Sequence, residues 1–148
     1  MILKNKKVLV TGAGGFIGSH LVEKLVEGGA NVKCFLKYNS RGGLGNLKKI
    51  SKEAFDNLEI LRGDLRDIED VRRAMKDSEM VFHLGALISI PYSYENPRGY
   101  IETNTLGTFN ILEVAKNLGT LEKIAITSTS EVYGTAVYSP IDEEHPLQ

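Results

Sequence analysis

Two kinds of segment alternate along the chain, and they differ in how apolar residues are spaced. Short apolar runs bounded by lysine, acidic residues or glycine predict buried strands, at residues 6–11, 31–36, 58–64, 79–86 and 122–129. Apolar residues at helical spacing between these runs predict helices, at residues 16–27, 67–76 and 98–118. The polar, glycine-bearing stretch 37–55 predicts a loop with one or two helical turns near Leu47.

Each predicted helix has either an apolar stripe along one side or a residue suited to one of its ends. The stripe of the first helix, which we expect to face the core, consists of Ile17, Leu21, Val22, Leu25 and Val26. Asp67 is a candidate N-cap of the second helix, because its carboxylate can accept hydrogen bonds from the free N–H groups of the first turn. In the third helix Ile111, Ala115 and Leu118 share one side. Gly119 is expected to end that helix.

The strands are continuously apolar rather than alternating, which predicts a parallel sheet with both faces covered. Right-handed crossovers then give an α/β fold with a doubly wound sheet, and strand order 3-2-1-4-5 is the natural expectation. In such sheets ligands bind beyond the carboxyl ends of the strands. Three polar or glycine-rich stretches follow such ends, at residues 12–18, 83–86 and 127–131. We therefore expect them to share one edge of the sheet.

Composition and charge are those of an ordinary globular domain. The 148 residues suffice for one domain with its own core. Lys plus Arg is 18 and Asp plus Glu is 19, so charge gives no reason to expect nucleic acid or a membrane as partner. The N-terminus lacks a signal-peptide core and no apolar run approaches a membrane span, so we expect a cytoplasmic protein. Cys34 is the only cysteine; it excludes an internal disulfide and is expected to be a small buried hydrophobe.

Three evenly spaced glycines lie between the first predicted strand and the first predicted helix. Gly12 permits the tight turn out of the strand, and Gly18 permits close packing of the helix on it. A side chain at Gly15 would block a pyrophosphate from the free N–H groups that begin the helix. The spacing is G-x-x-G-x-x-G, and its place in a strand–turn–helix unit indicates a Rossmann-type dinucleotide site. The alternative is a glycine turn needed for packing alone.

Five motifs in order resemble the signatures of the extended short-chain dehydrogenases/reductases: TGAGGFIGSH, GDLRD, VFHLGA, NTLGTFNIL and TSTSEVYG. That family contains nucleotide-sugar epimerases, dehydratases and decarboxylases, and the resemblance covers the whole chain. Two further stretches, ISIPYSYENP and TSTSEVYGTAVYSPIDEEHPLQ, resemble nucleotide-sugar 4,6-dehydratases that feed legionaminic-acid-like sugars. The resemblance implies a nucleotide-sugar substrate, no metal ion and, at full length, a homodimer.

The resemblance also implies a role for individual residues in binding the cofactor. The pyrophosphate would be lined by Gly12, Gly15, Phe16, Ile17 and Gly18. Asp64 and Leu65 would flank the adenine, the alternative for Asp64 being a helix cap. Positions near the nicotinamide-side ribose and the adjoining strand ends would be Leu84, Gly85, Ala86 and Thr127. His83 and Asn104 are expected to be structural, with Asn104 bonding across to a neighbouring strand.

The position that usually selects NAD departs from the pattern. NAD-selective members carry Asp or Glu at the end of the second strand, where it binds the ribose hydroxyls. This chain has Leu36, Lys37 and Tyr38 there. Lys37, Ser40 and Arg41 can instead hold a 2′-phosphate, or they form a solvated basic loop. The residues favour NADP and the narrower resemblance favours NAD; we expect NAD, with NADP possible.

The run TSTSEVYG places Thr129 where the family has a catalytic Ser or Thr. In a 4,6-dehydratase, oxidation at C4 of the sugar acidifies the C5 proton, and a carboxylate can remove it while water leaves from C6. We assign Glu131 as that base, with Ser130 assisting; the alternative is that Glu131 only caps the next helix. The same triplet occurs in nucleotide-uronate decarboxylases, so decarboxylation remains open beside dehydration, as does 4-epimerisation.

The Tyr-x-x-x-Lys motif of the family is absent from the 148 residues. Neither Tyr133 nor Tyr138 is followed by lysine four positions on. We therefore expect the chain to be the N-terminal, cofactor-binding part of a longer enzyme and to be inactive by itself. The alternative of another class is a non-catalytic dinucleotide-binding module.

Overall fold

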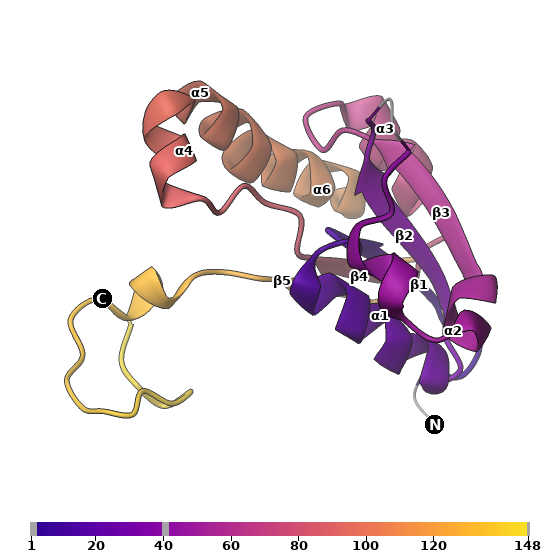
Figure 1. The fold of residues 1–148 in the computed structure, drawn as a ribbon, viewed down its shortest axis with the longest axis horizontal. Helices are drawn as coiled ribbons and strands as arrows, with labels where there is room; N and C mark the ends of the chain where they lie inside the picture. The colour runs from indigo at the N-terminus through magenta and orange to yellow at the C-terminus, as the bar shows by residue number, and fades with distance from the viewer. Residues whose placement is uncertain (1–2, 40–41, 148) are drawn as a thin grey trace.

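The computed structural model describes residues 3–39 and 42–147. Strands and helices alternate along the chain (Figure 1). The strands are β1 (Lys7–Thr11), β2 (Asn31–Lys37), β3 (Leu58–Gly63), β4 (Met80–His83) and β5 (Lys123–Ile126). The α-helices are α1 (Phe16–Glu27), α2 (Lys52–Asp56), α3 (Ile68–Met75), α4 (Ile90–Glu95), α5 (Pro97–Tyr100) and α6 (Gly107–Lys116). Two short 3₁₀ helices, η1 (Gly45–Lys49) and η3 (Ser130–Tyr133), and one π-helical segment, η2 (Ile101–Leu106), complete the elements.

The five strands form one parallel sheet in the order β3-β2-β1-β4-β5, which confirms the predicted doubly wound topology. β1 lies at the centre, with β2 on one side and β4 on the other. Thr11, the last residue of β1, pairs in register with Phe35 of β2 and His83 of β4. The carboxyl ends of three neighbouring strands therefore meet at one edge, beside the point where the winding reverses.

Apolar residues on the two faces of the sheet form two separate cores. Successive β1 side chains point to opposite faces, so Val8 and Val10 join one core and Leu9 joins the other. The first core includes Val22 and Leu25 of α1. The second core is completed by helices α3 and α6, through Val71, Ala74, Met75, Ile111 and Val114. Figure 1 accordingly shows α1 on one side of the sheet and α3 with α6 on the other.

Local sequence signals explain several element boundaries. The Asp67 side chain accepts hydrogen bonds from the backbone N–H groups of Glu69 and Asp70, which confirms it as the N-cap of α3. Gly29, just after α1, has a φ of +85°, a backbone conformation that glycine adopts without strain. Cys34 is fully buried, and burial raises the pKa of its thiol to about 12. These observations confirm Asp67 as a helix cap and Cys34 as a small buried residue.

The predicted helix 98–118 is confirmed to within two residues at each end, but its interior and its terminating residue differ from the prediction. The helical run begins at Pro97 and changes to π-helical geometry over residues 101–106 before α6 completes it. It ends at Lys116, with Asn117 rather than Gly119 after the last helical residue. A π segment widens one turn by a residue and leaves no periodicity signal in so short a stretch. The preceding loop also contains an unpredicted helix, α4, whose first turn carries Pro91.

Two further expectations need correction. Ile17 is 66% exposed, so it does not belong to the buried stripe of α1. It lies in the first turn of α1, directly after the glycine turn that follows β1. Strands β4 and β5 are also shorter than predicted, ending at His83 and Ile126, because the chain diverges from the sheet where the polar edge begins.

In the described ranges, no helix has the length and apolar character to cross a membrane.

Candidate dinucleotide-binding site

The glycine turn after β1 is shaped by close backbone contacts. Gly12 has a φ of +68°, and a Cβ there would stand 2.8 Å from the backbone nitrogen of Gly85. The N–H of Gly15 donates to the carbonyl oxygen of Gly12 at 2.9 Å, which closes the turn. A Cβ on Gly18 would lie 2.2 Å from that same carbonyl oxygen. Gly12 and Gly18 are therefore fixed by packing, as the spacing predicted.

Gly15 differs from its two partners because it faces solvent. It is the N-cap of α1 with φ of −71° and ψ of 176°, and a Cβ would meet only the Gly12 carbonyl oxygen, at 3.1 Å. Among the described residues no side chain caps α1. The first N–H groups of the helix, from Phe16 and Ile17, have no intrahelical acceptor. Positive helix-dipole charge and free donors together make this turn a ready anion site.

A buried hydrogen-bond chain runs from β1 through β4 to the long helix. Thr11 Oγ1 accepts from the N–H groups of Leu84 at 3.2 Å and Gly85 at 3.0 Å. Its own hydrogen then points to Nδ1 of His83, 2.7 Å away. His83 Nε2 lies 3.0 Å from Thr108 Oγ1, whose hydroxyl donates to the Asn104 carbonyl. This arrangement requires a neutral His83 that carries its proton on Nε2, and burial lowers the pKa of the imidazole.

The segment after β4 is held by Asn104. Its side-chain oxygen accepts from the Leu87 N–H at 2.8 Å, and its side-chain nitrogen donates to the Leu87 carbonyl at 2.9 Å. Asn104 is therefore structural, as expected, although it bonds to the segment beyond the strand rather than to the strand. Leu65 also packs here, because its Cδ1 would lie 2.7 Å from a Cβ on Gly85. The structure thus brings Gly12, Leu65 and Gly85 together.

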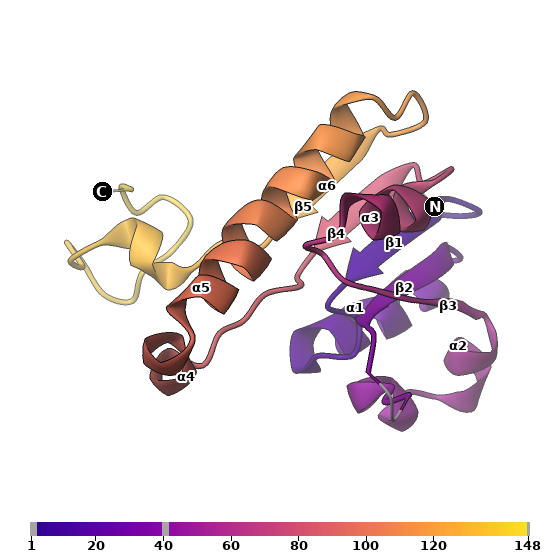
Figure 2. The ribbon, with the colours of Figure 1, turned by 90° about the horizontal axis from the view of Figure 1, so that it is seen from above.

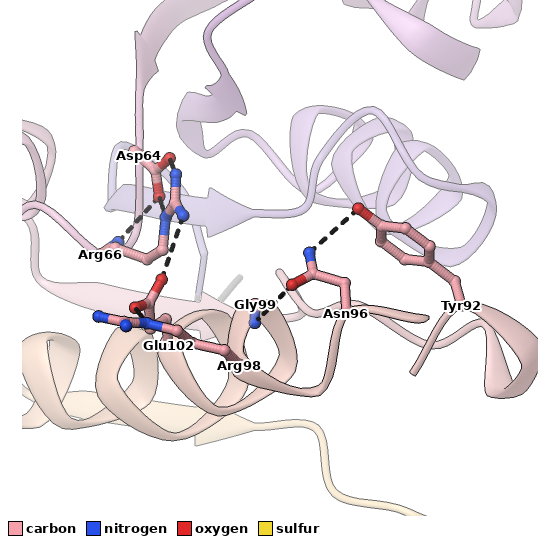
Figure 3. Close-up of polar contacts among 7 residues, drawn as sticks. All are labelled: Asp64, Arg66, Tyr92, Asn96, Arg98, Gly99 and Glu102. Atoms are coloured by element: carbon pink, nitrogen blue, oxygen red, sulfur yellow. Dashed lines mark hydrogen bonds and ion pairs between the residues drawn. The ribbon is translucent and has the colours of Figure 1, made fainter. Parts of the chain in front are cut away.

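Asp64 carries the most heavily paired carboxylate at this edge (Figure 3). Arg66 binds it twice, with Nη2 to Oδ2 at 2.6 Å and Nε to Oδ1 at 3.0 Å. The Arg66 guanidinium holds the pKa of the Asp64 carboxyl below its usual range. Arg66 also reaches Glu102 of η2 at 3.4 Å, and Glu102 accepts from Arg98 Nε at 2.7 Å. The β3–α3 loop is thereby tied to the long helix, a connection that the sequence analysis missed.

A second polar group in Figure 3 shapes the start of the long helix. Asn96 accepts from the Gly99 N–H at 3.1 Å and donates to the Tyr92 hydroxyl at 3.1 Å. It therefore caps α5 and fixes α4 beside it. The only signal in the sequence is Asn before Pro97, which is typical of a helix start.

The end of β2 lacks an acidic side chain in the described structure. Leu36 is buried, with its Cδ2 3.2 Å from where a Cβ on Gly14 would stand. Lys37 and Tyr38 are exposed. Ser40 and Arg41, which the sequence also assigned here, lie outside the described residues. Of the three residues that the sequence assigned to a 2′-phosphate or a solvated basic loop, the described structure includes Lys37, which is exposed at the end of β2.

The residues assigned to catalysis lie apart from the glycine turn. The Thr127 N–H donates to the His83 carbonyl at 3.0 Å, so Thr127 lies at the same edge. Beyond it the chain leaves the sheet, and both views show η3 and the C-terminal segment away from α1 (Figures 1 and 2). Thr129 Oγ1 caps η3 by accepting from the Glu131 N–H at 3.4 Å, and Ser130 and Glu131 are exposed. Among the described residues no cluster of His, Cys, Asp and Glu could hold a metal ion.

A family model and two curated relatives match most or all of this chain. The model of the family described as GDP-mannose 4,6 dehydratase matches residues 9–148. A UDP-glucose 4-epimerase of Pisum sativum is 33% identical over 100% of this chain and 43% of its own length. UDP-glucuronic acid decarboxylase 6 of Arabidopsis thaliana is 37% identical over 95% of this chain and 38% of its own length. The chain therefore spans less than half the length of these curated relatives.

A solved structure shows the same fold. UDP-glucose 4-epimerase from Bifidobacterium longum, in complex with NAD⁺ and UDP, superposes with a TM-score of 0.80 at 29% identity. The match covers 97% of this chain and 43% of that one.

Proposed function

The chain belongs to the family described as GDP-mannose 4,6 dehydratase, among the extended short-chain dehydrogenases/reductases, and we propose that it is the NAD-binding, N-terminal part of a nucleotide-sugar 4,6-dehydratase. The observation that carries the proposal is the glycine turn. Gly15 is exposed at the start of α1, which no described side chain caps, and Gly12 of the same turn lies against the backbone of Gly85 just after β4. An exposed, donor-rich turn at the switch point of a doubly wound sheet is where such folds bind dinucleotides.

Each part of NAD is assigned to residues of this chain. The N–H groups of Phe16 and Ile17 hold the pyrophosphate, and Asp64 with Leu65 flanks the adenine. Leu84, Gly85, Ala86 and Thr127 take the nicotinamide-side ribose. When bound, NAD would supply the hydride acceptor for oxidation of the sugar and the hydride donor for its later reduction. The hydrogen bonds that join Thr11 to His83 and to the Gly85 N–H hold the backbone of Gly85 in place for its contact with the ribose.

The catalytic roles in the proposal fall on Thr129, Ser130 and Glu131. The Thr129 hydroxyl bonds the sugar oxygen at C4, and Glu131 removes the C5 proton once C4 is a ketone. Ser130 assists the departure of water from C6. Glu131 is exposed and has a free carboxylate to offer, since the cap of η3 is supplied by Thr129. These three residues must approach the glycine turn for catalysis, which the rest of the longer enzyme would bring about.

Two other reactions of the same family are kept as alternatives. The Arabidopsis relative is named a UDP-glucuronic acid decarboxylase, and the pea relative is named a UDP-glucose 4-epimerase. An epimerase neither removes nor delivers a proton at C5. A dehydratase removes one there and a decarboxylase delivers one there after carbon dioxide leaves, so the carboxyl group of Glu131 favours dehydration or decarboxylation. A non-catalytic dinucleotide-binding module is the alternative outside enzymology.

Mass spectrometry on the full-length enzyme distinguishes these reactions. It is incubated with UDP- or GDP-linked N-acetylglucosamine and, separately, with a nucleotide uronate. Loss of one water from the hexose, without net consumption of NAD, supports the dehydratase. Loss of carbon dioxide from the uronate without dehydration of the hexose would establish the decarboxylase. A new isomer of unchanged mass, separated from the substrate by chromatography, would establish the epimerase.

A further inference from the structure

The segment 130–147, which begins with η3, is organised around one buried side chain, His145. His145 is 3% exposed, and no other residue from 127 to 147, all of which are described, is buried. Among the described residues, the two cores of the sheet include nothing beyond Ile124. The segment, called the His145 loop below, therefore has a small centre of its own, and that centre is an imidazole rather than an apolar side chain.

Both ring nitrogens of His145 have a partner within the His145 loop. Nε2 accepts a hydrogen bond from the Val137 N–H at 2.9 Å, and Nδ1 lies 2.9 Å from the carbonyl oxygen of Pro146. A backbone N–H can only donate and a carbonyl can only accept, so this arrangement requires a neutral imidazole that carries its proton on Nδ1. The ring thus joins the middle of the loop to its end.

The same ring contacts two tyrosines. Tyr133, the last residue of η3, meets it edge to face, with ring centroids 5.5 Å apart and planes at 90°. Tyr138 lies 4.7 Å away at 52°, and its hydroxyl donates to Asp142 Oδ1 at 2.6 Å. Aromatic pairs of this kind favour particular angles as well as burial. His145 therefore sets how η3 is oriented on the loop, and both views show the segment curving back toward η3 (Figures 1 and 2).

η3 is too short to fix its own orientation. It has four residues, and the bonds at its ends are long: the Val132 N–H donates to the Thr129 carbonyl at 3.3 Å, and the Gly134 N–H donates to the Glu131 carbonyl at 3.1 Å. A single 3₁₀ turn gains little stability by itself. The direction of the exposed Glu131 side chain therefore depends on what holds Tyr133, two residues further along η3.

We propose that His145 is a positioning residue for Glu131: by closing the loop and packing against Tyr133, it sets the direction in which the Glu131 carboxylate is presented to C5 of the sugar. The inference rests on the proposed function, because it takes Glu131 as the base. His145 does not touch the sugar and acts only through η3. The His145 loop and η3 move as one unit when the longer enzyme brings them to the glycine turn.

NMR on the 148-residue chain tests the closure of the loop. Hydrogen exchange at the Val137 N–H should be about tenfold faster in His145→Ala, because the bond to Nε2 is lost. The melting temperature should match that of the parent, since the loop contributes to neither core. In the parent, the ¹⁵N shifts of His145 should be those of the tautomer with its proton on Nδ1. Glu144→Ala, an exposed neighbour, is the control and should leave both the exchange rate and the melting temperature unchanged.

A double-mutant cycle in the full-length enzyme tests the action through Glu131. His145→Ala should lower kcat for water loss from the nucleotide hexose by about 10–10²-fold, with KM changed by less than about twofold. In the Glu131→Gln background the same substitution should have almost no further effect, because no base remains to be positioned. His145→Gln keeps an acceptor for the Val137 N–H and should recover part of the loss in kcat. Glu144→Ala should retain the activity of the parent.

Three outcomes would each overturn the inference. Unchanged exchange at Val137 in His145→Ala would show that the loop closes without the imidazole. Unchanged kcat in that variant would show that Glu131 needs no such support. A loss of activity as large in the Glu131→Gln background as in the parent would show that His145 acts by another route.

Normal dehydration by Glu131→Gln would remove the base assignment of the proposed function and the inference with it. This failure is distinguishable from the three outcomes above, because exchange at Val137 would still be faster in His145→Ala.

Discussion

Thr11 Oγ1 lies 2.7 Å from Nδ1 of His83, and this contact joins the carboxyl ends of β1 and β4 where the glycine turn begins. The hydroxyl also accepts the backbone N–H of Gly85, so the histidine indirectly fixes the backbone beside Gly12. His83 must stay neutral to accept from Thr11, and burial favours that form by lowering the pKa of the imidazole from 6.5. The contact therefore makes the geometry of the site dependent on pH.

The first prediction concerns this pH dependence. The unfolded chain binds a proton at His83 near pH 6.5, whereas the folded chain takes it up only at lower pH. Stability from neutral His83 is complete above pH 6.5 and is lost as pH falls below that value. We expect the free energy of unfolding from urea titration to fall by up to about 1.4 kcal/mol per pH unit between pH 6.5 and 5.

The control is His83→Asn, which cannot titrate in this range. It should be less stable at pH 7.5 by about 1–3 kcal/mol, because the buried Thr11 hydroxyl loses Nδ1 of His83 as its acceptor, and it should lack the added loss below pH 6.5. His20→Asn, an exposed histidine on α1, should keep the pH dependence of the parent. An identical pH profile in His83→Asn and the parent would contradict the assignment.

The second prediction concerns Asn104. Asn104→Ala removes both hydrogen bonds to Leu87, so it should destabilise the chain by about 1–3 kcal/mol and speed hydrogen exchange at the Leu87 N–H. Asn117→Ala is the matched control, because its single bond to the Glu113 carbonyl is exposed; it should stay within about 0.5 kcal/mol of the parent. Unchanged exchange at Leu87 in Asn104→Ala would show that the segment is held by other contacts.

Most of the fold could be predicted because strong local signals agree with it. The strand β1 is apolar on both faces, and the glycines after it leave few alternatives for the backbone. The π segment and α4 could not be predicted, because neither leaves a distinct period in a few residues. Ile17 fits the helical stripe but is 66% exposed, and helical spacing alone does not reveal how far along α1 the core extends.

The candidate site was predictable only where a backbone requirement dictates the residue. Gly12 and Gly18 fall in this class, since a Cβ at either position meets backbone atoms at less than 3 Å. The pairing of Asp64 with Arg66 was missed, although the two residues are two apart in the sequence, because a surface ion pair depends on side-chain conformation. The link from Arg66 to Glu102 depends on packing between distant segments and has no local signal.

The third prediction concerns catalysis in the full-length enzyme. Glu131→Gln keeps the shape of the side chain but removes the base, so loss of water from the nucleotide hexose should fall by about 10²–10⁴-fold. Under single-turnover conditions, rapid-quench mass spectrometry should detect the 4-keto hexose that still carries its 6-hydroxyl. Glu143→Gln, another exposed acid of the same segment, is the control and should retain activity. Normal dehydration by Glu131→Gln would assign the base elsewhere.

The fourth prediction tests the central claim most directly, by calorimetric titration of NAD into the parent chain and into Gly15→Val. The extended backbone at Gly15 suits valine, and a Cβ there meets only the Gly12 carbonyl oxygen, at 3.1 Å, so a shift of a few tenths of an ångström should let the variant fold with a modest loss of melting temperature. The added methyl groups should nonetheless stand where the pyrophosphate reaches the N–H groups of Phe16 and Ile17. We predict that the parent binds one NAD per chain and that Gly15→Val, still folded, does not. Equal NAD binding by the folded variant and the parent, or none by the parent, would contradict the assignment of the glycine turn as a dinucleotide site.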